Sequence, residues 1–259
     1  MIPTLRLAAA VAALSLAALA QTPTPAPSPF PLAPPPGPQI YPHPMDESDA
    51  GFVPIFDGNS LQNWEGDPRY WRVQDHELVG EVTPATLLKQ NNFIIWRGGA
   101  PANFELKADY RITAHGNSGI NYRSVEIPGT RYLLRGYQAD IDGESRYTGQ
   151  NYEERGRTFL AMRGTMTHVG ADGATVIASL GDAEALQAYI HTDDWNHYHL
   201  IVRGNVMIHI LNGHVMSEVI DDDAAHRTFS GLIGVQVHVG PPMKVEYRSI
   251  LLKVLPDGK

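Results

Sequence analysis

Carboxylate and amide side chains alternate with apolar ones along residues 136–142, which read Gly-Tyr-Gln-Ala-Asp-Ile-Asp. Successive side chains of a β-strand point to opposite faces. Gln138, Asp140 and Asp142 would therefore share one face, and the residues between them would enter a core. Solvated strand faces usually carry Lys, Thr or Glu rather than an amide and two short carboxylates. The segment is therefore either a plain outer strand or one that presents acid/base groups to a ligand.

Residues 234–240, Gly-Val-Gln-Val-His-Val-Gly, repeat this design. The valines would face inward, with Gln236 and His238 outward. If the two strands lie in one sheet, their polar faces form a platform of amide, carboxylate and imidazole groups. A single histidine in a strand often has only a structural role, so the case for His238 depends on its shared phase with Asp140.

The N-terminal part of the chain predicts export. Residues 1–20 contain one basic residue, Arg6, an apolar run from Leu7 to Leu19, and small residues at 18 and 20, the pattern of a signal peptide. The apolar run is too short for a membrane span. Residues 21–44 contain 11 prolines and predict a disordered linker. We expect a periplasmic or secreted bacterial protein with no integral membrane segment after signal cleavage.

Residues 45–259 predict one domain. The chain of 259 residues has no cysteine, so disulfides are excluded. Loss of Arg6 leaves 19 basic residues against 28 acidic ones, a net charge of −9, which disfavours a nucleic-acid partner.

Short alternating runs dominate this domain, and the clearest is 104–112. Residues 144–173 look irregular, and 183–190 is the one plausible helix. Asn212-Gly213 is a strong signal for a two-residue hairpin turn. The pattern predicts an all-β fold: a two-sheet antiparallel β-sandwich, or jelly roll.

An ordered set of short motifs resembles the 3-keto-disaccharide hydrolase family, whose members are also described as 3-keto-glucoside 1,2-lyases and 3-keto-2-hydroxy-glucal hydratases. The resemblance covers about residues 51–255 and includes 51–58, 116–120, 136–142, 152–156, 194–196 and 232–244. It implies a concanavalin A-like jelly roll and a saccharide substrate.

The resemblance also implies elimination chemistry. A ketone at carbon 3 of a sugar acidifies the hydrogen on carbon 2, so the enzyme needs a base for that hydrogen, a stabiliser for the enediolate and an acid for the leaving oxygen. Asp140 and His238 are the candidates for acid/base work. Arg123 or Arg155 is the candidate for the oxyanion.

Further side chains complete the predicted site. Asn117, Gln138 and Gln236 suit hydrogen bonding to sugar hydroxyls, although Asn117 is equally a turn residue beside Gly116. Glu154 lies in a charged run, 153–155, that is either a solvated loop or a third catalytic contribution. Gln138 and Gln236 would line the platform itself with Asp140 and His238. Asn117, Arg123 and the 152–155 loop, which includes Arg155, would lie at its rim.

Three alternatives stay open. A laminarinase-type glycosidase needs two carboxylates on one strand face. Gln138 stands where one of them would be expected, but Asp140 and Asp142 remain. A divalent metal is conceivable on Asp140, Glu154 and His238, although no cofactor is certain. The third alternative is a non-catalytic carbohydrate-binding module.

Overall fold

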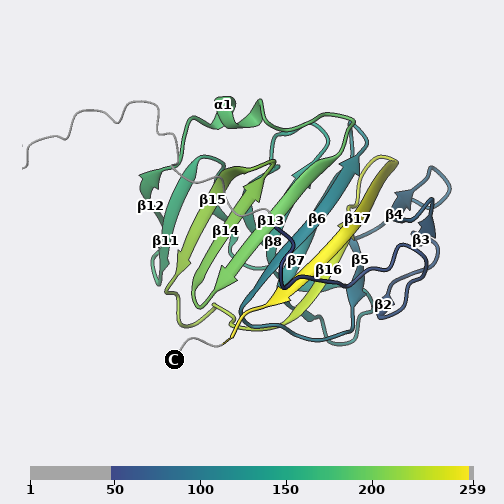
Figure 1. Ribbon diagram of the computed structural model, residues 1–259, viewed down its shortest axis with the longest axis horizontal. Coiled ribbons are helices and arrows are strands. Elements are labelled where there is room, and N and C mark those ends of the chain that lie inside the picture. Colours follow the sequence, from purple (N-terminus) through teal and green to yellow (C-terminus); the bar gives the residue numbers. More distant parts are fainter. Residues whose placement is uncertain (1–47, 257–259) are drawn as a thin grey trace, which may run out of the picture. The chain divides into compact units, whose positions relative to one another are not determined.

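The computed structural model describes residues 48–256, which form 17 strands and one short helix (Figure 1). The expected signal peptide and linker, residues 1–44, lie outside the described residues. None of the described helices is long and apolar enough to cross a membrane.

A ten-stranded sheet forms one layer, in the order β12-β11-β15-β14-β13-β6-β17-β4-β3, with β1 added beside β17. All its strand pairs are antiparallel except β11 with β15. Its strands are β1 (Val53–Pro54), β3 (Trp71–Gln74), β4 (Glu77–Val82), β6 (Phe104–Ile112), β11 (Thr165–Gly170), β12 (Gly173–Ser179), β13 (Asn196–Arg203), β14 (Val206–Leu211), β15 (His214–Asp221) and β17 (Met243–Val254).

A seven-stranded antiparallel sheet forms the other layer, in the order β10-β9-β8-β7-β16-β5-β2. Its strands are β2 (Trp64–Glu65), β5 (Asn92–Trp96), β7 (Asn117–Glu126), β8 (Leu134–Asp142), β9 (Asn151–Glu154), β10 (Thr158–Ala161) and β16 (Leu232–Val237). The helix α1 (Ala183–Gln187) lies in the connection between β12 and β13. The predicted two-sheet sandwich is confirmed.

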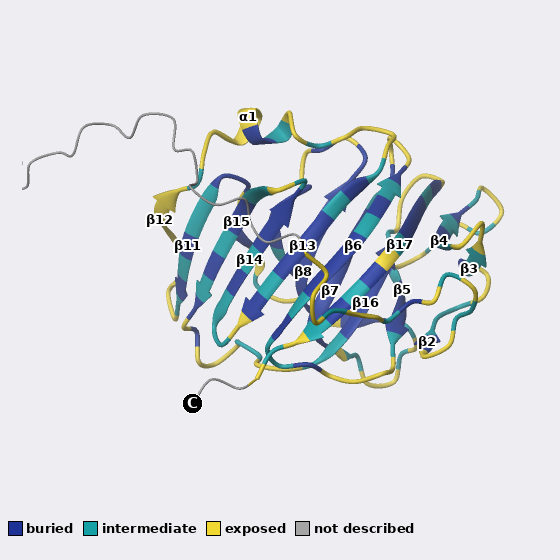
Figure 2. Cartoon of the chain, in the orientation of Figure 1, coloured by how far each residue is buried: buried dark blue, intermediate teal, exposed yellow. Residues whose placement is uncertain are grey.

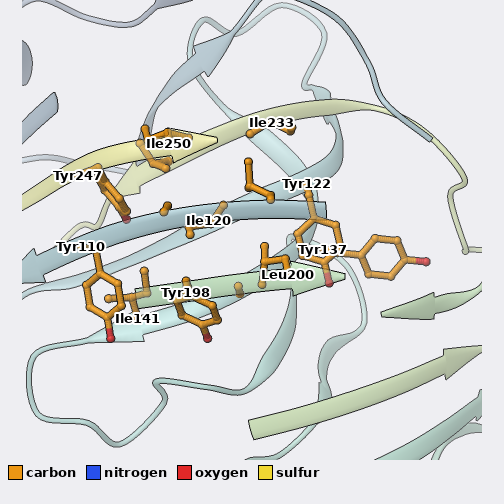
Figure 3. Packing of buried hydrophobic residues seen from close by; sticks show 14 of the residues in the cluster. Tyr110, Ile120, Tyr122, Tyr137, Ile141, Tyr198, Leu200, Ile233, Tyr247 and Ile250 are labelled. Carbon is orange, nitrogen blue, oxygen red and sulfur yellow. The ribbon is translucent and has the colours of Figure 1, made fainter. Parts of the chain in front are cut away.

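The core lies between the sheets and contains a layer of buried tyrosines (Figure 3). Tyr122 and Tyr137 extend from the seven-stranded sheet, and Tyr198 extends from the ten-stranded one. The Tyr122 and Tyr137 rings stack with centroids 5.6 Å apart. This core takes the inward-facing residues of β7, β8 and β16, so the alternate residues of those strands face away from it.

Several local predictions are confirmed. Strand β6 covers the predicted range, and Asn212 and Gly213 form the predicted turn between β14 and β15, with φ of 50° and 80°. The predicted helix is present but ends at Gln187. Lys107 of β6 is buried, because residues before β1 cover it and its Nζ donates to the Ser48 carbonyl and the Asp49 carboxylate.

The prediction that residues 144–173 are irregular was wrong. They contain β9, β10 and β11, and β12 begins at Gly173. Every residue of β12 is exposed, as Figure 2 shows at the edge of the ten-stranded sheet. A strand without a buried face has no need of alternating hydrophobicity, so alternation gave no signal for β12.

Candidate functional site

The outward faces of β7, β8 and β9 form a polar surface on the seven-stranded sheet. Gln138 pairs with Asn121 of β7 on one side and with Tyr152 of β9 on the other, and Asp140 pairs with Gly119. Strand β16 lies on the far side of β7, which brings Gln236 into the same sheet. The two polar strands inferred from their shared alternation thus lie one strand apart.

A pocket of about 160 Å³ opens on this surface. Five of the eight predicted site residues line it, together with three aromatic residues: Asn117, Gln138, Asp140, Glu154 and His238, with Tyr147, Tyr152 and Phe159. Asp140 and His238 therefore share one pocket, as the strand phase predicted. Their catalytic roles stay predictions.

A row of amides holds Asp140 in place. Gln236 Nε2 donates to Gln138 Oε1 at 3.3 Å, and Gln138 Nε2 donates to Asp140 Oδ1 at 3.1 Å. Gln236 is fully buried and does not line the pocket, so it contacts a ligand only through Gln138. A predicted substrate-binding residue thus becomes a positioning residue.

Asp140 is only 6% exposed, and its burial raises its pKa from 3.8 to about 8. The hydrogen bond from Gln138 lowers the pKa, but less than burial raises it, and the negative charges of Asp142 and Glu154 raise it further. Asp140 therefore carries its proton at neutral pH. A protonated carboxyl in a pocket is a proton donor.

Glu154 approaches the same pocket from β9. Its Oε1 accepts a hydrogen bond from Asn91 Nδ2 at 3.2 Å, and Asn91 Oδ1 accepts the Val239 backbone N–H at 3.0 Å. Asn91 thus connects the Glu154 carboxylate to the segment that carries His238. This residue was missed from the sequence because it precedes β5 in a loop, where no strand phase predicts its direction.

His238 lies one residue beyond the end of β16. Its Nδ1 is 2.6 Å from the Val239 carbonyl oxygen, and because a carbonyl can only accept, Nδ1 carries the hydrogen. Nε2 then holds a free lone pair and has no hydrogen-bond partner among the described residues. This tautomer suits a general base.

Aromatic rings form one wall of the pocket. Phe159 stacks on Tyr147 with centroids 6.0 Å apart and meets the edge of Tyr152 at 5.0 Å. Tyr147 and Phe159 are 37% and 40% exposed, so their rings are accessible to a ligand in the pocket. Flat apolar walls beside polar groups suit a sugar ring, which has C–H faces and a hydroxyl rim.

Asp142 is directed into a loop. Its Oδ1 accepts the N–H groups of Tyr147 and Thr148 at 2.8 and 3.0 Å, and its Oδ2 accepts that of Arg146 at 3.0 Å. Both oxygens are thereby committed to shaping residues 143–150. Asp142 is unsuited to act as the second carboxylate of a glycosidase with Asp140.

Arg123 does not lie at the rim of this pocket, so that prediction was wrong. The residue adopts a φ of 45° at a bulge between Tyr122 and Val125, which breaks the strand alternation. Its guanidinium is buried and donates to the carbonyls of Ala102 and Gly204, each at 2.7 Å. Arg123 fastens β7 to neighbouring loops and is not available for an oxyanion.

Arg155 also lies outside the Asp140 pocket. Its Nε is 3.6 Å from Glu154 Oε1, and its side chain lines a neighbouring pocket.

Asn117 and His238 also line a third pocket, of about 240 Å³, with His115, Glu144 and Arg146.

No three His, Cys, Asp or Glu side chains among residues 48–256 are grouped as a metal site requires. The suggested set of Asp140, Glu154 and His238 is therefore not arranged as a metal centre, although all three side chains line one pocket.

The family model for a 3-keto-alpha-glucoside-1,2-lyase-like domain matches residues 51–253. The chain belongs to this family. The match takes in all strands of the described domain except the last residue of β17, so the lyase-like domain and the sandwich are the same unit. Family membership supports a carbohydrate-active protein. Comparison with curated protein sequences gives no match.

Solved structures with the same fold support the architecture. A candidate glycosyl hydrolase from Parabacteroides distasonis is 18% identical, with a TM-score of 0.54, covering 79% of this chain and 99% of that one. A Bacillus subtilis protein of unknown function with a galectin-like fold is 14% identical, with a TM-score of 0.52, covering 78% and 94%. At these identities the likeness establishes the fold of the lyase-like domain.

Proposed function

We propose that this protein cleaves glycosides whose sugar carries a ketone at carbon 3, by elimination across carbons 1 and 2 followed by hydration. The observation that carries the proposal is the pairing, in one pocket, of a protonated Asp140 with a His238 whose Nε2 is free. Family membership supports the substrate class.

His238 is the base in this proposal. The ketone makes the hydrogen on carbon 2 acidic, and the Nε2 lone pair takes it to give an enediolate. The bond from Nδ1 to the Val239 carbonyl fixes the tautomer that leaves Nε2 unprotonated. Positive charge that develops on the ring lies in the same pocket as Glu154, which stabilises it.

Asp140 is the acid. With a pKa of about 8 it is protonated below that pH and donates its proton to the glycosidic oxygen as the bond to carbon 1 breaks. Gln138 keeps the carboxyl aimed through the bond to Oδ1. In the hydration step the roles reverse: the Asp140 carboxylate takes a proton from water as it adds at carbon 1, and protonated His238 returns a proton to carbon 2.

Two donors are available for the enediolate oxygen in place of the arginines. The Asn117 amide and the Tyr152 hydroxyl line the pocket, and neither has a hydrogen-bond partner among the described residues. Burial raises the pKa of Tyr152, so its hydroxyl keeps its hydrogen.

The test compares a 3-keto-glucoside with its unoxidised parent in deuterated water. Elimination predicts cleavage of the keto sugar alone, with deuterium at carbon 2 of the released 3-keto sugar. Asp140→Asn and His238→Ala should each lower kcat by about 10²- to 10⁴-fold, the usual contribution of one acid/base group. Asp172→Asn and His168→Ala, remote changes at the β11–β12 edge, are the matched controls.

Two other outcomes would overturn the proposal. Asp140 and Glu154 share the pocket, and two carboxylates in one pocket also favour an ordinary glycosidase. Fast cleavage of the unoxidised glycoside without label at carbon 2 would establish that reaction instead. Saturable binding of either sugar without turnover would identify a carbohydrate-binding module.

A further inference from the structure

Gly119 lies in the middle of the polar surface, on β7, the strand between the two polar strands β8 and β16. It pairs with Asp140 of β8 on one side. On the other side, the register that pairs Val235 with Ile120 places Gln236 beside Gly119. The residues two positions before and after it, which share its outward direction, are both asparagines. Gly119 is therefore a position without a side chain between residues that carry amides.

The side chain of Gln138 occupies the space above Gly119. A Cβ atom on Gly119 would lie 2.5 Å from Cγ and Cδ of Gln138 and 2.6 Å from its Nε2. Non-bonded carbon atoms pack at about 3.5–4.0 Å, so any larger residue at position 119 excludes the observed conformation of Gln138. The glutamine is only 2% exposed and lies directly against the backbone of β7.

The course of Gln138 across β7 lets it use both ends of its amide. Nε2 donates to Asp140 Oδ1, and Oε1 accepts from Gln236 Nε2. Strand β16, which carries Gln236, lies on the far side of β7 from β8. The amide of Gln138 therefore reaches its second partner only by crossing β7, and it crosses at Gly119.

The backbone conformation gives no other reason for a glycine at this position. Gly119 is not among the described glycines whose φ lies in the left-handed region. The three heavy atoms nearest to an added Cβ all belong to Gln138. A glycine inside a strand weakens the strand and often marks a place where another group approaches the backbone closely. At Gly119 that group is the side chain of Gln138.

We propose that Gly119 is a positioning residue, whose missing side chain leaves the space through which Gln138 crosses β7 and holds the Asp140 carboxyl in the pocket. The effect on cleavage rests on the proposed function, in which Asp140 is the acid. The close approach and the row of hydrogen bonds stand on the geometry alone.

Gly119→Ala tests this role, because alanine fits the strand backbone but displaces Gln138. We expect kcat for a 3-keto-glucoside to fall by about tenfold, the upper range for one hydrogen bond between neutral groups. Gly170→Ala on β11 is the matched control. Its φ is also outside the left-handed region, and its Cβ would meet one described atom within 4 Å, His168 Cε1 at 3.9 Å. An unchanged kcat in Gly119→Ala overturns the proposal.

The same substitution in a Gln138→Ala background shows whether the alanine acts through the glutamine. With Gln138 truncated, the space above Gly119 is empty. Gly119→Ala should then change kcat by less than about twofold, the usual margin for changes that do not interact. The double variant should fold even if Gly119→Ala alone does not. A tenfold loss that persists in the double variant, or a double variant that fails to fold, would show that the alanine conflicts with something other than Gln138 and overturns the proposal.

A titration that needs no turnover separates this inference from the proposed function. Carbon-13 NMR of the Asp140 carboxyl carbon measures its pKa. The hydrogen bond from Gln138 lowers this pKa, and the charges of Asp142 and Glu154, which raise it, stay in place. Gly119→Ala and Gln138→Ala should therefore both raise the pKa of Asp140 above its wild-type value. Such a rise supports the positioning role even if no 3-keto-glucoside is cleaved, and an unchanged pKa in Gly119→Ala overturns it.

Discussion

The buried carboxyl of Asp140 should make the stability of the protein fall as the pH rises. Its pKa is raised from 3.8 to about 8 by burial, so the native state holds a proton that the unfolded chain releases at much lower pH. Stability from this group is fully present below pH 3.8 and is lost as the pH rises toward 8. Each pH unit in this range lowers the free energy of unfolding by about 1.4 kcal/mol at most, so the loss between pH 4 and pH 8 is about 5 kcal/mol.

Asp140→Asn isolates this contribution. The amide is neutral at every pH, has nearly the same shape and retains an oxygen to accept from Gln138. The free energy of unfolding of the variant relative to wild type should therefore rise by about 5 kcal/mol between pH 4 and pH 8, which corresponds to about 10–20 °C in Tm for a domain of this size.

Urea denaturation of wild type, Asp140→Asn and the exposed control Asp172→Asn over this pH range measures the effect. The difference between wild type and Asp172→Asn should stay flat. If the difference between wild type and Asp140→Asn is also flat, the carboxyl is ionised in the native protein and cannot be the proton donor. An Asp140→Asn variant that is more stable than wild type at pH 8 but inactive would show that the buried catalytic acid lowers the free energy of unfolding.

Three further outcomes follow from the structure and the sequence. Arg123→Met should lower the free energy of unfolding by about 3 kcal/mol, because buried carbonyls lose their donors. KM should stay unchanged. A raised KM with normal stability would place Arg123 in the site after all. Phe159→Ala should raise KM more than it lowers kcat, because it removes pocket wall rather than an acid or base, and steady-state kinetics that show only a kcat loss would contradict this. Intact-mass measurement of the exported protein should show cleavage after Ala20, and a retained N-terminus would exclude the predicted signal peptide.

Strand alternation predicted the part of the site that lies on regular strands. Gln138 and Asp140 share a face because their strand is unbroken, and His238 lies close enough to the end of β16 to keep its phase. Arg123 followed the same pattern in the sequence, but the bulge at this position turned it away. A bulge depends on the register of two strands, so one strand's sequence does not reveal it.

The remaining site residues come from segments whose sequences show no regular alternation of apolar and polar residues. Asn91 and Tyr147 reach the site from loops, and Phe159 comes from a strand of only four residues. Asn121, which pairs with Gln138 in the register, is fully buried, and neither of its amide atoms has a hydrogen-bond partner among the described residues. The positions of these loop and short-strand residues are set by the packing of segments that are distant in the sequence, and composition alone does not predict them.

The position of the last strand determines when the domain can be completed. Strand β17 lies between β6 and β4 and also pairs with β1, where Val53 meets Leu252. Strands β1, β3 and β4 have no other link to the ten-stranded sheet. A chain emerging from the ribosome therefore cannot join β1, β3 and β4 to the other strands of this sheet until β17 has been made, nearly 200 residues after β1. The domain is completed by very long-range strand pairings, which predicts slow folding and a growing chain whose sheet stays incomplete for most of its synthesis.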